Sequence, residues 1–230
     1  MTKSTIEPRF IAIEGAIGAG KTSLVNLLGE NYGARLILEE TEANPFISKF
    51  YEDKEAYSFQ TQVFFLLSRY KQYMELAQRD LFNSVVVIDY LFQRDKVFAR
   101  LNLEDHEYNL YEQIFSLINA KAPKPDLVIY LQASTEVLQE RVAKRGREYE
   151  AFMDSDYLDS VNKAFDNFFF YYSETPLLVI NTNDIDFVEK KCDLEELINK
   201  VNNHKIGSCL LYTSDAADEG LGVDLGGRRI

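Results

Sequence analysis

A glycine-rich segment near the N-terminus carries the clearest chemical pattern of the sequence. Gly15 to Thr22 reads GAIGAGKT and matches GxxxxGK[S/T], between an apolar run and a stretch of helical character. Glycines let backbone N–H groups turn toward a phosphate, and a helix N-terminus adds partial positive charge. Lys21 of such a loop reaches the terminal phosphates, and the Thr22 hydroxyl faces Mg²⁺. We expect a nucleoside triphosphate to bind at Gly15, Ala16, Ile17, Gly18, Ala19, Gly20, Lys21, Thr22 and Ser23.

A basic cluster further along the chain supplies charge for the phosphoryl group in transfer. Arg141, Lys144 and Arg145 fall on one helix face at i, i+3 and i+4, and Arg147 follows just after Gly146. The alternative is a solvated helix end that complements the helix dipole. We expect Arg141, Arg145 and Arg147 to act with Lys21 in catalysis.

Two classes of nucleotide-binding protein compete at this point. A kinase transfers the γ-phosphoryl group to an acceptor, whereas a GTPase-like switch hydrolyses it. A switch carries the guanine-reading pattern NKxD, but Asn162 to Phe165 reads NKAF and Asp166 comes one position too late. A DxxG pattern occurs only after Gly207. The kinase is therefore favoured.

The overall charge limits the possible partners. The chain of 230 residues carries 25 Lys and Arg against 37 Asp and Glu, a net charge of −12. Such a protein repels a nucleic-acid polymer, so its anionic ligand must be small and met by a local basic cluster. Two cysteines are too few for a disulfide framework, and we find neither a signal peptide nor an apolar run of membrane-spanning length. We expect a cytoplasmic protein.

Short apolar runs alternate with longer helical stretches. Continuous apolar runs rich in Val and Ile are typical of strands buried on both faces, and they are found at 10–13, 36–38, 85–88, 127–131 and 177–180. We expect helices at 22–32, 57–82, 108–121, 135–144 and 157–173. Strands connected through helices predict a three-layer α/β domain, a five-stranded parallel sheet with helices on both faces.

The C-terminal segment differs in composition from the rest. Five of the 11 glycines fall within 207–230, where we find neither strand alternation nor a sustained helical face. Ser208 to Glu219 reads SCLLYTSDAADE and resembles a translated sequencing adapter, the alternative being a flexible natural tail. We expect one domain over residues 1–206 and a non-domain, disordered tail over 207–230.

Several motifs in one order resemble a known family. Residues 8 to about 203 resemble the deoxynucleoside kinases, above all bacterial members that act on purine deoxynucleosides. The matching segments are IAIEGAIGAGKTSL, EETEANPFISKFYED, SFQTQVFFLLSRYKQ, IDYLFQRDKVFA, PKPDLVIYL and RVAKRGREYE. The resemblance implies the P-loop kinase fold, ATP and Mg²⁺ as cofactors, a small deoxynucleoside as substrate, no membrane partner and a homodimer.

The resemblance also implies a base for the reaction. Glu39 aligns with the family glutamate that activates the 5′-hydroxyl, at the end of the second strand where ligands bind in open parallel sheets. The family follows this glutamate with Pro-Val, but this chain has Glu40 and Thr41. Glu40 and Glu42 are therefore rival bases.

The nucleoside is expected along the long helix after Tyr57. Gln62 and Arg69 lie two turns apart and share a face, whereas Gln60 lies roughly 200° around from Gln62. By resemblance, Gln62, Arg69 and Asp95 read the base, and Phe65 flanks the ring, while Phe64 or Phe65 can equally be core. Tyr51 and Glu150 are expected at the sugar 3′-hydroxyl. Because Arg beside Asp presents donors next to an acceptor, we expect deoxyadenosine first, then deoxyguanosine and deoxycytidine.

The third strand departs from the family. Members related to animal enzymes have Glu-Arg-Ser there, and this chain has Asp89, Tyr90 and Leu91. Asp89 is a candidate Mg²⁺ ligand together with Thr22, since Mg²⁺ takes few protein oxygens and retains waters. Arg94 or Lys96 is expected to replace the missing arginine. His106 and His204 lack ligand spacing and are expected at the surface.

Together these patterns predict an ATP-dependent deoxynucleoside kinase of nucleotide salvage that forms a 5′-monophosphate and ADP. A nucleoside monophosphate kinase is the alternative within the same fold. A nucleotide-dependent switch is the alternative from another class.

Overall fold

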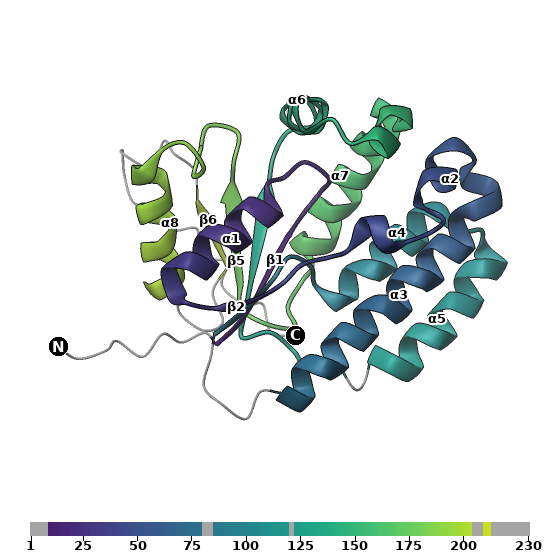
Figure 1. The fold of residues 1–230 in the computed structure, drawn as a ribbon, viewed down its shortest axis with the longest axis horizontal. Helices are drawn as coiled ribbons and strands as arrows, with labels where there is room; N and C mark the ends of the chain where they lie inside the picture. The colour runs from purple at the N-terminus through teal and green to yellow at the C-terminus, as the bar shows by residue number, and fades with distance from the viewer. Residues whose placement is uncertain (1–8, 80–84, 120–121, 204–208, 213–230) are drawn as a thin grey trace, which may run out of the picture.

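The strands of the computed structural model form one parallel sheet. The structure describes residues 9–79, 85–119, 122–203 and 209–212. Its strands are β1 (Phe10–Gly15), β2 (Arg35–Ile37), β3 (Val86–Ile88), β4 (Leu127–Gln132), β5 (Leu177–Asn181) and β6 (Cys209–Tyr212). They lie in the order β2-β3-β1-β4-β5-β6, and every neighbouring pair is parallel. All five expected strands are present, and the expected three-layer fold is confirmed (Figure 1).

The two central strands have the burial that their sequences predict. Every residue of β1 is buried, and so are the first five of β4. Ile13 lies beside Ile129 across this pair, and Ala12 lies beside Ile88 across the pair with β3. A strand buried on both faces requires helices on both sides of the sheet.

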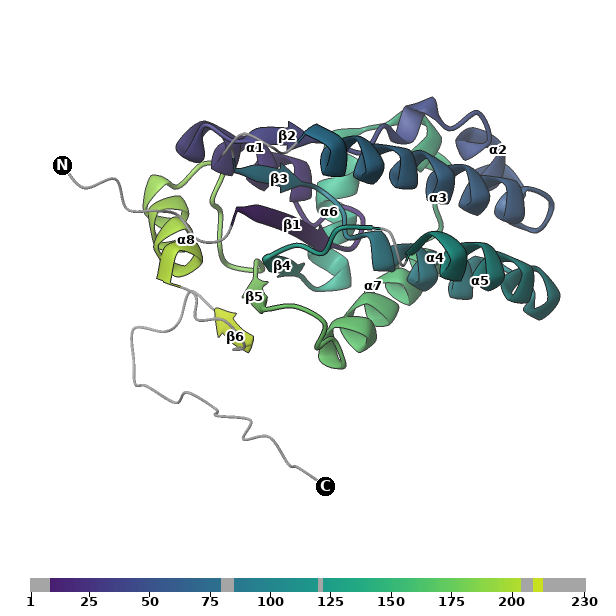
Figure 2. The ribbon, with the colours of Figure 1, turned by 90° about the horizontal axis from the view of Figure 1, so that it is seen from below.

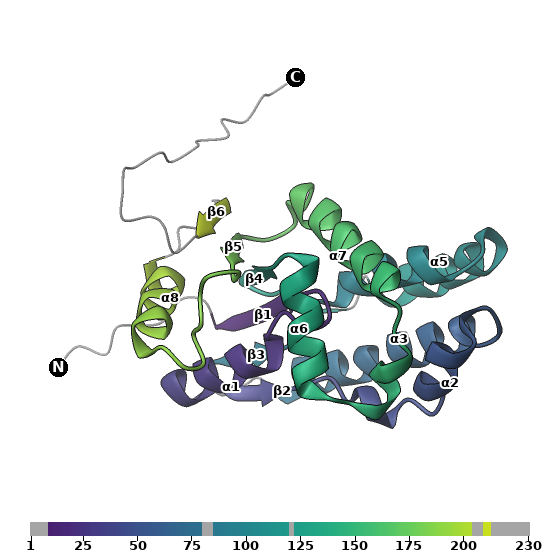
Figure 3. The ribbon, with the colours of Figure 1, turned by 90° about the horizontal axis from the view of Figure 1, so that it is seen from above.

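Helices cover the sheet in two unequal layers. The helices are α1 (Lys21–Tyr32), α2 (Ile47–Glu52), α3 (Lys54–Arg79), α4 (Asp95–Asn102), α5 (Asp105–Asn119), α6 (Thr135–Arg145), α7 (Ser155–Phe170) and α8 (Lys191–Asn203). Figure 2 shows α1 and α8 on one side of the sheet and α3, α4, α5 and α7 on the other. Figure 3 shows α6 in front of the sheet, and its residue Leu138 contacts the glycine-rich loop that follows β1.

The helix boundaries differ from the expected ones at several points. Three helices, α2, α4 and α8, were not expected, and the first two have only six and eight residues. Helix α3 begins at Lys54, three residues before the expected start. The expected ends of α3 and α5, at Phe82 and Lys121, lie outside the described residues.

The expectation that residues 207–230 lie outside the fold is wrong for one short stretch. Cys209–Tyr212 forms β6, which pairs in parallel with β5 and extends the edge of the sheet. Three apolar or aromatic residues in this stretch, LLY, suit an edge strand. The other residues of the expected tail fall outside the described part of the chain.

Parallel strands bring their carboxyl ends to one edge of the sheet. The loop after β1 lies in the middle of that edge, beside the loop after β3, and the loop after β2 comes next. Ligands of open parallel sheets bind at this edge. Within the described residues no helix is long and apolar enough to span a bilayer.

Candidate active site

The glycine-rich loop has the backbone that its sequence predicts. Gly18 and Gly20 take positive φ angles of 88° and 93°, in a region that other L residues rarely adopt. A Cβ atom at Gly18 would lie 2.8 Å from the carbonyl oxygen of Leu138 in α6. Helix α1 begins at Lys21 directly after this turn, so its N-terminal N–H groups face the loop.

Lys21 folds over the loop. Its Nζ donates to the carbonyl oxygens of Gly15 at 2.8 Å and Ala16 at 2.9 Å. Burial, and secondly the positive charge of Arg94, lower the pKa of Lys21 to about 8. The Lys21 ammonium group can exchange these two carbonyl oxygens for phosphate oxygens as hydrogen-bond partners, and its charge stays the same.

Thr22 and Asp89 form a small oxygen cluster at the start of α1. The Thr22 hydroxyl donates to Asp89 Oδ2 at 3.2 Å, and the backbone N–H of Glu39 donates to Asp89 Oδ1 at 2.7 Å. Burial, and then the neighbouring Glu39 carboxylate, raise the pKa of Asp89. Groups of three or more His, Cys, Asp or Glu able to hold a metal are absent from the described residues. A hydroxyl beside one carboxylate fits Mg²⁺, which retains most of its waters.

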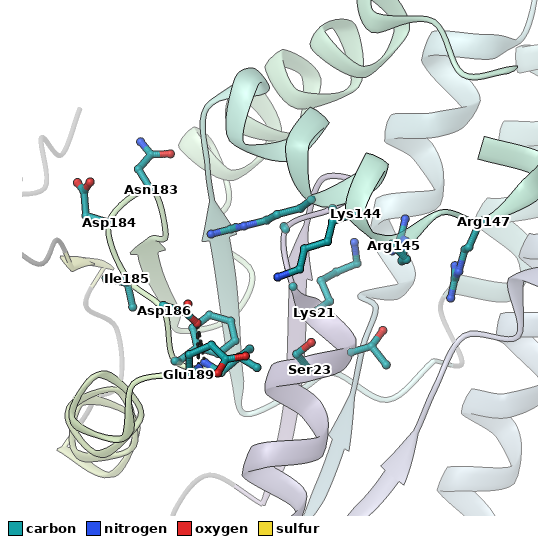
Figure 4. Close-up of a pocket in the computed structure, with 17 residues that line it drawn as sticks. Lys21, Ser23, Lys144, Arg145, Arg147, Asn183, Asp184, Ile185, Asp186 and Glu189 are labelled. Atoms are coloured by element: carbon teal, nitrogen blue, oxygen red, sulfur yellow. Dashed lines mark hydrogen bonds between the residues drawn. The ribbon is translucent and has the colours of Figure 1, made fainter. Parts of the chain in front are cut away.

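A cavity of about 610 Å³ opens beside the glycine-rich loop. Figure 4 shows its labelled residues in two groups, with Lys21, Ser23, Lys144, Arg145 and Arg147 toward one side and Asn183 to Glu189 on the other. The first group is largely cationic, and the second belongs to the loop between β5 and α8. The cavity is large enough for a nucleotide and is positively charged at one end.

The expected basic cluster divides in the structure. Arg141 donates to the carbonyl oxygen of Thr182 at 2.7 Å and to its hydroxyl at 3.0 Å, and it lines only the large cavity. Arg145 and Arg147 line the large cavity and a second, smaller one. The helical spacing placed these arginines together correctly but did not reveal that Arg141 is bound to the loop after β5.

The smaller cavity, of about 120 Å³, contains most of the residues expected at the acceptor. It is lined by Ile17, Lys21, Thr22, Glu39, Thr41, Ile47, Tyr51, Gln62, Phe65, Arg69, Asp89, Arg94, Phe98, Arg145, Arg147, Tyr149 and Glu150. Four of these residues, Lys21, Thr22, Arg145 and Arg147, line both cavities. The two cavities therefore meet at the phosphate loop and the basic cluster.

Glu39 lies between two buried arginines. Its Oε1 accepts from Arg69 and its Oε2 from Arg94, and Arg69 also pairs with Asp95. Burial acts to raise the pKa of Glu39, but the charges of Arg69 and Arg94 outweigh it and hold that pKa well below its usual range. The rivals Glu40 and Glu42 are exposed and do not line the smaller cavity.

The residues expected at the sugar also come together. Glu150 is buried and accepts from Arg145 Nε at 3.2 Å, while Arg147 Nη1 lies 4.0 Å from its Oε1. The ring of Tyr51 stacks on that of Tyr149 with centroids 6.0 Å apart. Burial, and then nearby groups including Glu150, raise the pKa of Tyr51, so its hydroxyl stays protonated.

Comparisons with known proteins identify the family. The model of the family described as deoxynucleoside kinase matches residues 11–206. The chain belongs to the deoxynucleoside kinase family.

Individual relatives agree with this assignment. The deoxyguanosine kinase of Bacillus subtilis is 36% identical over 193 residues, covering 82% of this chain and 93% of that protein. The deoxyadenosine kinase of Dictyostelium discoideum is 34% identical over 192 residues, covering 81% of this chain and 77% of the other. Among solved structures, the deoxyadenosine kinase from M. mycoides with bound dATP matches with a TM-score of 0.72 and 26% identity, covering 84% and 99% of the chains.

As a deoxynucleoside kinase, the protein is a phosphotransferase with a deoxynucleoside as its substrate and a nucleotide as its phosphate donor. The expected activity is thereby confirmed, in preference to a nucleoside monophosphate kinase or a switch.

Some lining residues of this deoxynucleoside kinase were not expected from the sequence. They are Thr41, Ile47, Phe98 and Tyr149 in the smaller cavity and the loop from Asn183 to Glu189 in the larger one. Their types are common and their positions depend on packing, so no pattern singled them out. Glu14 was also missed, although a charged residue inside the apolar run FIAIEG is an unusual signal.

Arg94 and Lys96, the two candidates to replace the missing arginine, lie in different surroundings. Arg94 is buried beside Glu39 and lines the smaller cavity. Lys96 is partly exposed and pairs with Glu112 on α5 at 2.7 Å. Arg94 therefore brings positive charge to the smaller cavity, whereas Lys96 is paired away from it on α5.

Proposed function

We propose that this kinase transfers the γ-phosphoryl group of ATP to the 5′-hydroxyl of a purine deoxynucleoside, as a step of nucleotide salvage. The observation that carries this proposal is the junction of the two cavities. Lys21, Thr22, Arg145 and Arg147 line both, so a phosphoryl group leaving the larger cavity enters the smaller one beside four groups able to contact it.

The donor side holds and polarises the triphosphate. The N–H groups of residues 15–23 face the phosphates, and Lys21 exchanges its two carbonyl partners for phosphate oxygens. Thr22 and Asp89 would hold Mg²⁺, which neutralises charge on the phosphates when bound. Arg145 and Arg147 stabilise negative charge that develops on the transferring group. Arg141 acts at the side of the larger cavity formed by the loop that follows Thr182, to which Arg141 is bonded.

The acceptor side orients the hydroxyl. Glu39 is held ionised by Arg69 and Arg94, so it accepts a hydrogen bond from the 5′-hydroxyl throughout the usual pH range. In phosphoryl transfer the transition state is loose, and positioning contributes more than deprotonation. Glu39 acts as the base and takes the proton once the 5′-oxygen has begun to bond to phosphorus, and Tyr51 and Glu150 hold the 3′-hydroxyl.

The base is read at the far end of the smaller cavity. Gln62 is buried on the same face of α3 as Arg69, and the Arg69 guanidinium lies 4.9 Å from the centroid of the Phe65 ring. The pair of Arg69 and Asp95 offers donors beside an acceptor, which suits the N7 and amino group of adenine. A purine substrate is supported by the relatives named deoxyguanosine kinase and deoxyadenosine kinase.

A homodimer is supported by an apolar row on α5. Leu110 and Leu117 are 50% and 75% exposed, Ile114 lies between them, and Leu67 on the neighbouring α3 is 49% exposed. Leu110, Ile114 and Leu117 lie at i, i+4 and i+7 along α5, so these three side chains form one stripe. Sedimentation of the wild type and of Leu117→Glu tests the proposal: a dimer that becomes a monomer supports it, and a monomeric wild type contradicts it.

The experiment that tests the function couples ADP release to a panel of acceptors. Deoxynucleosides should support ADP formation and yield 5′-monophosphates, while deoxynucleoside monophosphates should not. Activity on monophosphates alone would indicate the alternative kinase class, and ADP release without an acceptor would indicate a hydrolytic switch.

A further inference from the structure

Glu14 is a fully buried carboxylate next to the phosphate loop. It is the fifth residue of β1, with 0% of its surface exposed, among apolar strand neighbours. Burial outweighs the nearby positive charges and raises its pKa. A carboxylate in such a place is costly unless its oxygens are bonded, and here they are.

The two oxygens of Glu14 bind two different loops. Its Oε2 accepts from the backbone N–H of Gly15 at 3.1 Å, which begins the phosphate loop. Its Oε1 accepts from the backbone N–H of Leu91, in the segment that follows β3. Glu14 thus connects the donor loop with the segment that leads to Arg94.

Glu14 also faces the Arg94 side chain. Arg94 is only 3% exposed, its Nε lies 3.7 Å from Glu14 Oε1, and its Nη2 pairs with Glu39. Different nitrogens of one planar guanidinium therefore face two carboxylates. Because the guanidinium is rigid, fixing the position of Nε determines where Nη2 points.

Among the described residues between β3 and α4, Arg94 is the one that carries a positive charge. Tyr90 occupies the position directly after Asp89, and its hydroxyl donates to Gln72. Arg69 on α3 reaches Glu39 Oε1, and Arg94, at the end of the short 3₁₀ helix η2 (Phe92–Arg94), brings the second positive charge to Glu39 Oε2. Glu14 holds the start of this segment through Leu91 and its end through the Arg94 side chain.

We propose that Glu14 is a positioning residue for phosphoryl transfer. It orients the Arg94 guanidinium toward Glu39, and it fixes the donor loop relative to that guanidinium. The inference rests on the proposed roles of Glu39 and Arg94. Glu14 lines neither of the two cavities, so its effect passes through Arg94 and through the loop that begins at Gly15.

The test is a double-mutant cycle with Glu14→Gln and Arg94→Lys. Glutamine keeps the size of Glu14 but loses its charge, and a lysine has one nitrogen, which cannot face Glu14 and Glu39 together. Each single variant should lower kcat by ~10- to 100-fold, the cost of a small misplacement at a reacting centre. The KM for the deoxynucleoside should change by less than about threefold, because residues at the base are untouched.

The combined variant decides whether Glu14 acts through Arg94. Because Arg94→Lys already removes the guanidinium that Glu14 orients, adding Glu14→Gln should lower kcat by less than about threefold more. Independent effects of the two substitutions would multiply. Multiplicative losses, or a Glu14→Gln enzyme with the wild-type kcat, overturn the inference. Glu112→Gln, which removes a partly exposed glutamate on α5, is the matched control and should keep the wild-type kcat.

Two further measurements separate the possible failures. If Glu14→Gln does not fold, by circular dichroism, Glu14→Asp, which shortens the side chain, takes its place in the cycle: a loss of kcat that disappears in the Arg94→Lys background supports the inference, and a wild-type kcat overturns it. Arg94→Met tests the underlying function. If Arg94→Met is impaired and Arg94→Lys is not, a positive charge at position 94 is sufficient for activity, and only the proposed role of Glu14 is wrong. A fully active Arg94→Met removes Arg94 from the proposed mechanism.

Discussion

The hydroxyl of Thr22 donates to the carboxylate of Asp89 across 67 positions of sequence, at a distance of 3.2 Å. Thr22 is the second residue of α1, which follows the phosphate loop after β1, and Asp89 follows β3, so the contact joins the ends of neighbouring strands at the carboxyl edge of the sheet. The pair places two hard oxygen atoms beside the expected phosphates, as Mg²⁺ requires.

Asp89→Asn should raise the Mg²⁺ concentration that gives half-maximal activity by about 10-fold or more, because an amide oxygen carries no negative charge. Thermal melting should change little in the absence of nucleotide. Titration of Mg²⁺ at saturating ATP measures the effect, with Asp105→Asn on the exposed surface as control. An unchanged Mg²⁺ dependence would remove Asp89 from the metal site.

The pH dependence of ATP use should report Lys21. Its pKa of about 8 means that the free enzyme loses the positive charge of this side chain as the pH rises through about 8. The value of kcat/KM for ATP should therefore fall above that pH, while kcat should fall only at higher pH, because bound phosphates raise the pKa again. A kcat/KM profile that stays flat from about pH 7 to about pH 9.5 would contradict this assignment.

Glu39→Gln should lower kcat by ~10² to 10⁴, the range typical of a missing general base, with little change in ATP affinity. Glu40→Gln and Glu42→Gln are matched controls, since both residues are exposed and outside the smaller cavity. The acidic limb of the kcat profile should not reflect Glu39, whose pKa is held below its usual range. Loss of activity in a control variant, with an active Glu39→Gln, would show that another glutamate is the base.

Asp95→Ala should reduce deoxyadenosine use more than deoxyguanosine use, by about 10-fold or more in the ratio of kcat/KM values, because the acceptor for the adenine amino group is lost. Competition between the two nucleosides measures this ratio directly. Asp95→Asn keeps the size of the side chain and should show a smaller shift. Equal losses for both nucleosides would remove the basis for an adenine preference.

Shortening the chain to end at Lys205 removes β6 and the rest of the segment after the domain. The residues that line the two cavities within the described part of the chain lie between positions 17 and 189, so kcat/KM should be unchanged. The melting temperature should fall by no more than about 4 °C, since only four residues of edge pairing are lost. Lost activity would show that the segment is part of the working enzyme.

The sequence alone determined the parts of this protein that depend on local pattern. GAIGAGKT predicted a phosphate loop, since glycine is needed where φ is positive, and Gly18 and Gly20 have such angles. Continuous apolar runs predicted all five main strands, because a strand buried between two helical layers has no polar face. The motif order predicted the family, and with it Glu39, which the structure places in the smaller cavity while Glu40 and Glu42 remain outside.

Only the tertiary structure decided which distant groups meet. Arg94 rather than Lys96 lies beside Glu39, Glu14 bonds to Leu91 and Gly15 at once, and Arg141 binds the loop after β5. Local pattern could not predict these contacts, because they depend on strand order and on how short segments such as η2 turn. Parallel strands in the order β2-β3-β1-β4-β5 bring their carboxyl ends together, and this common edge turns separate motifs into one site.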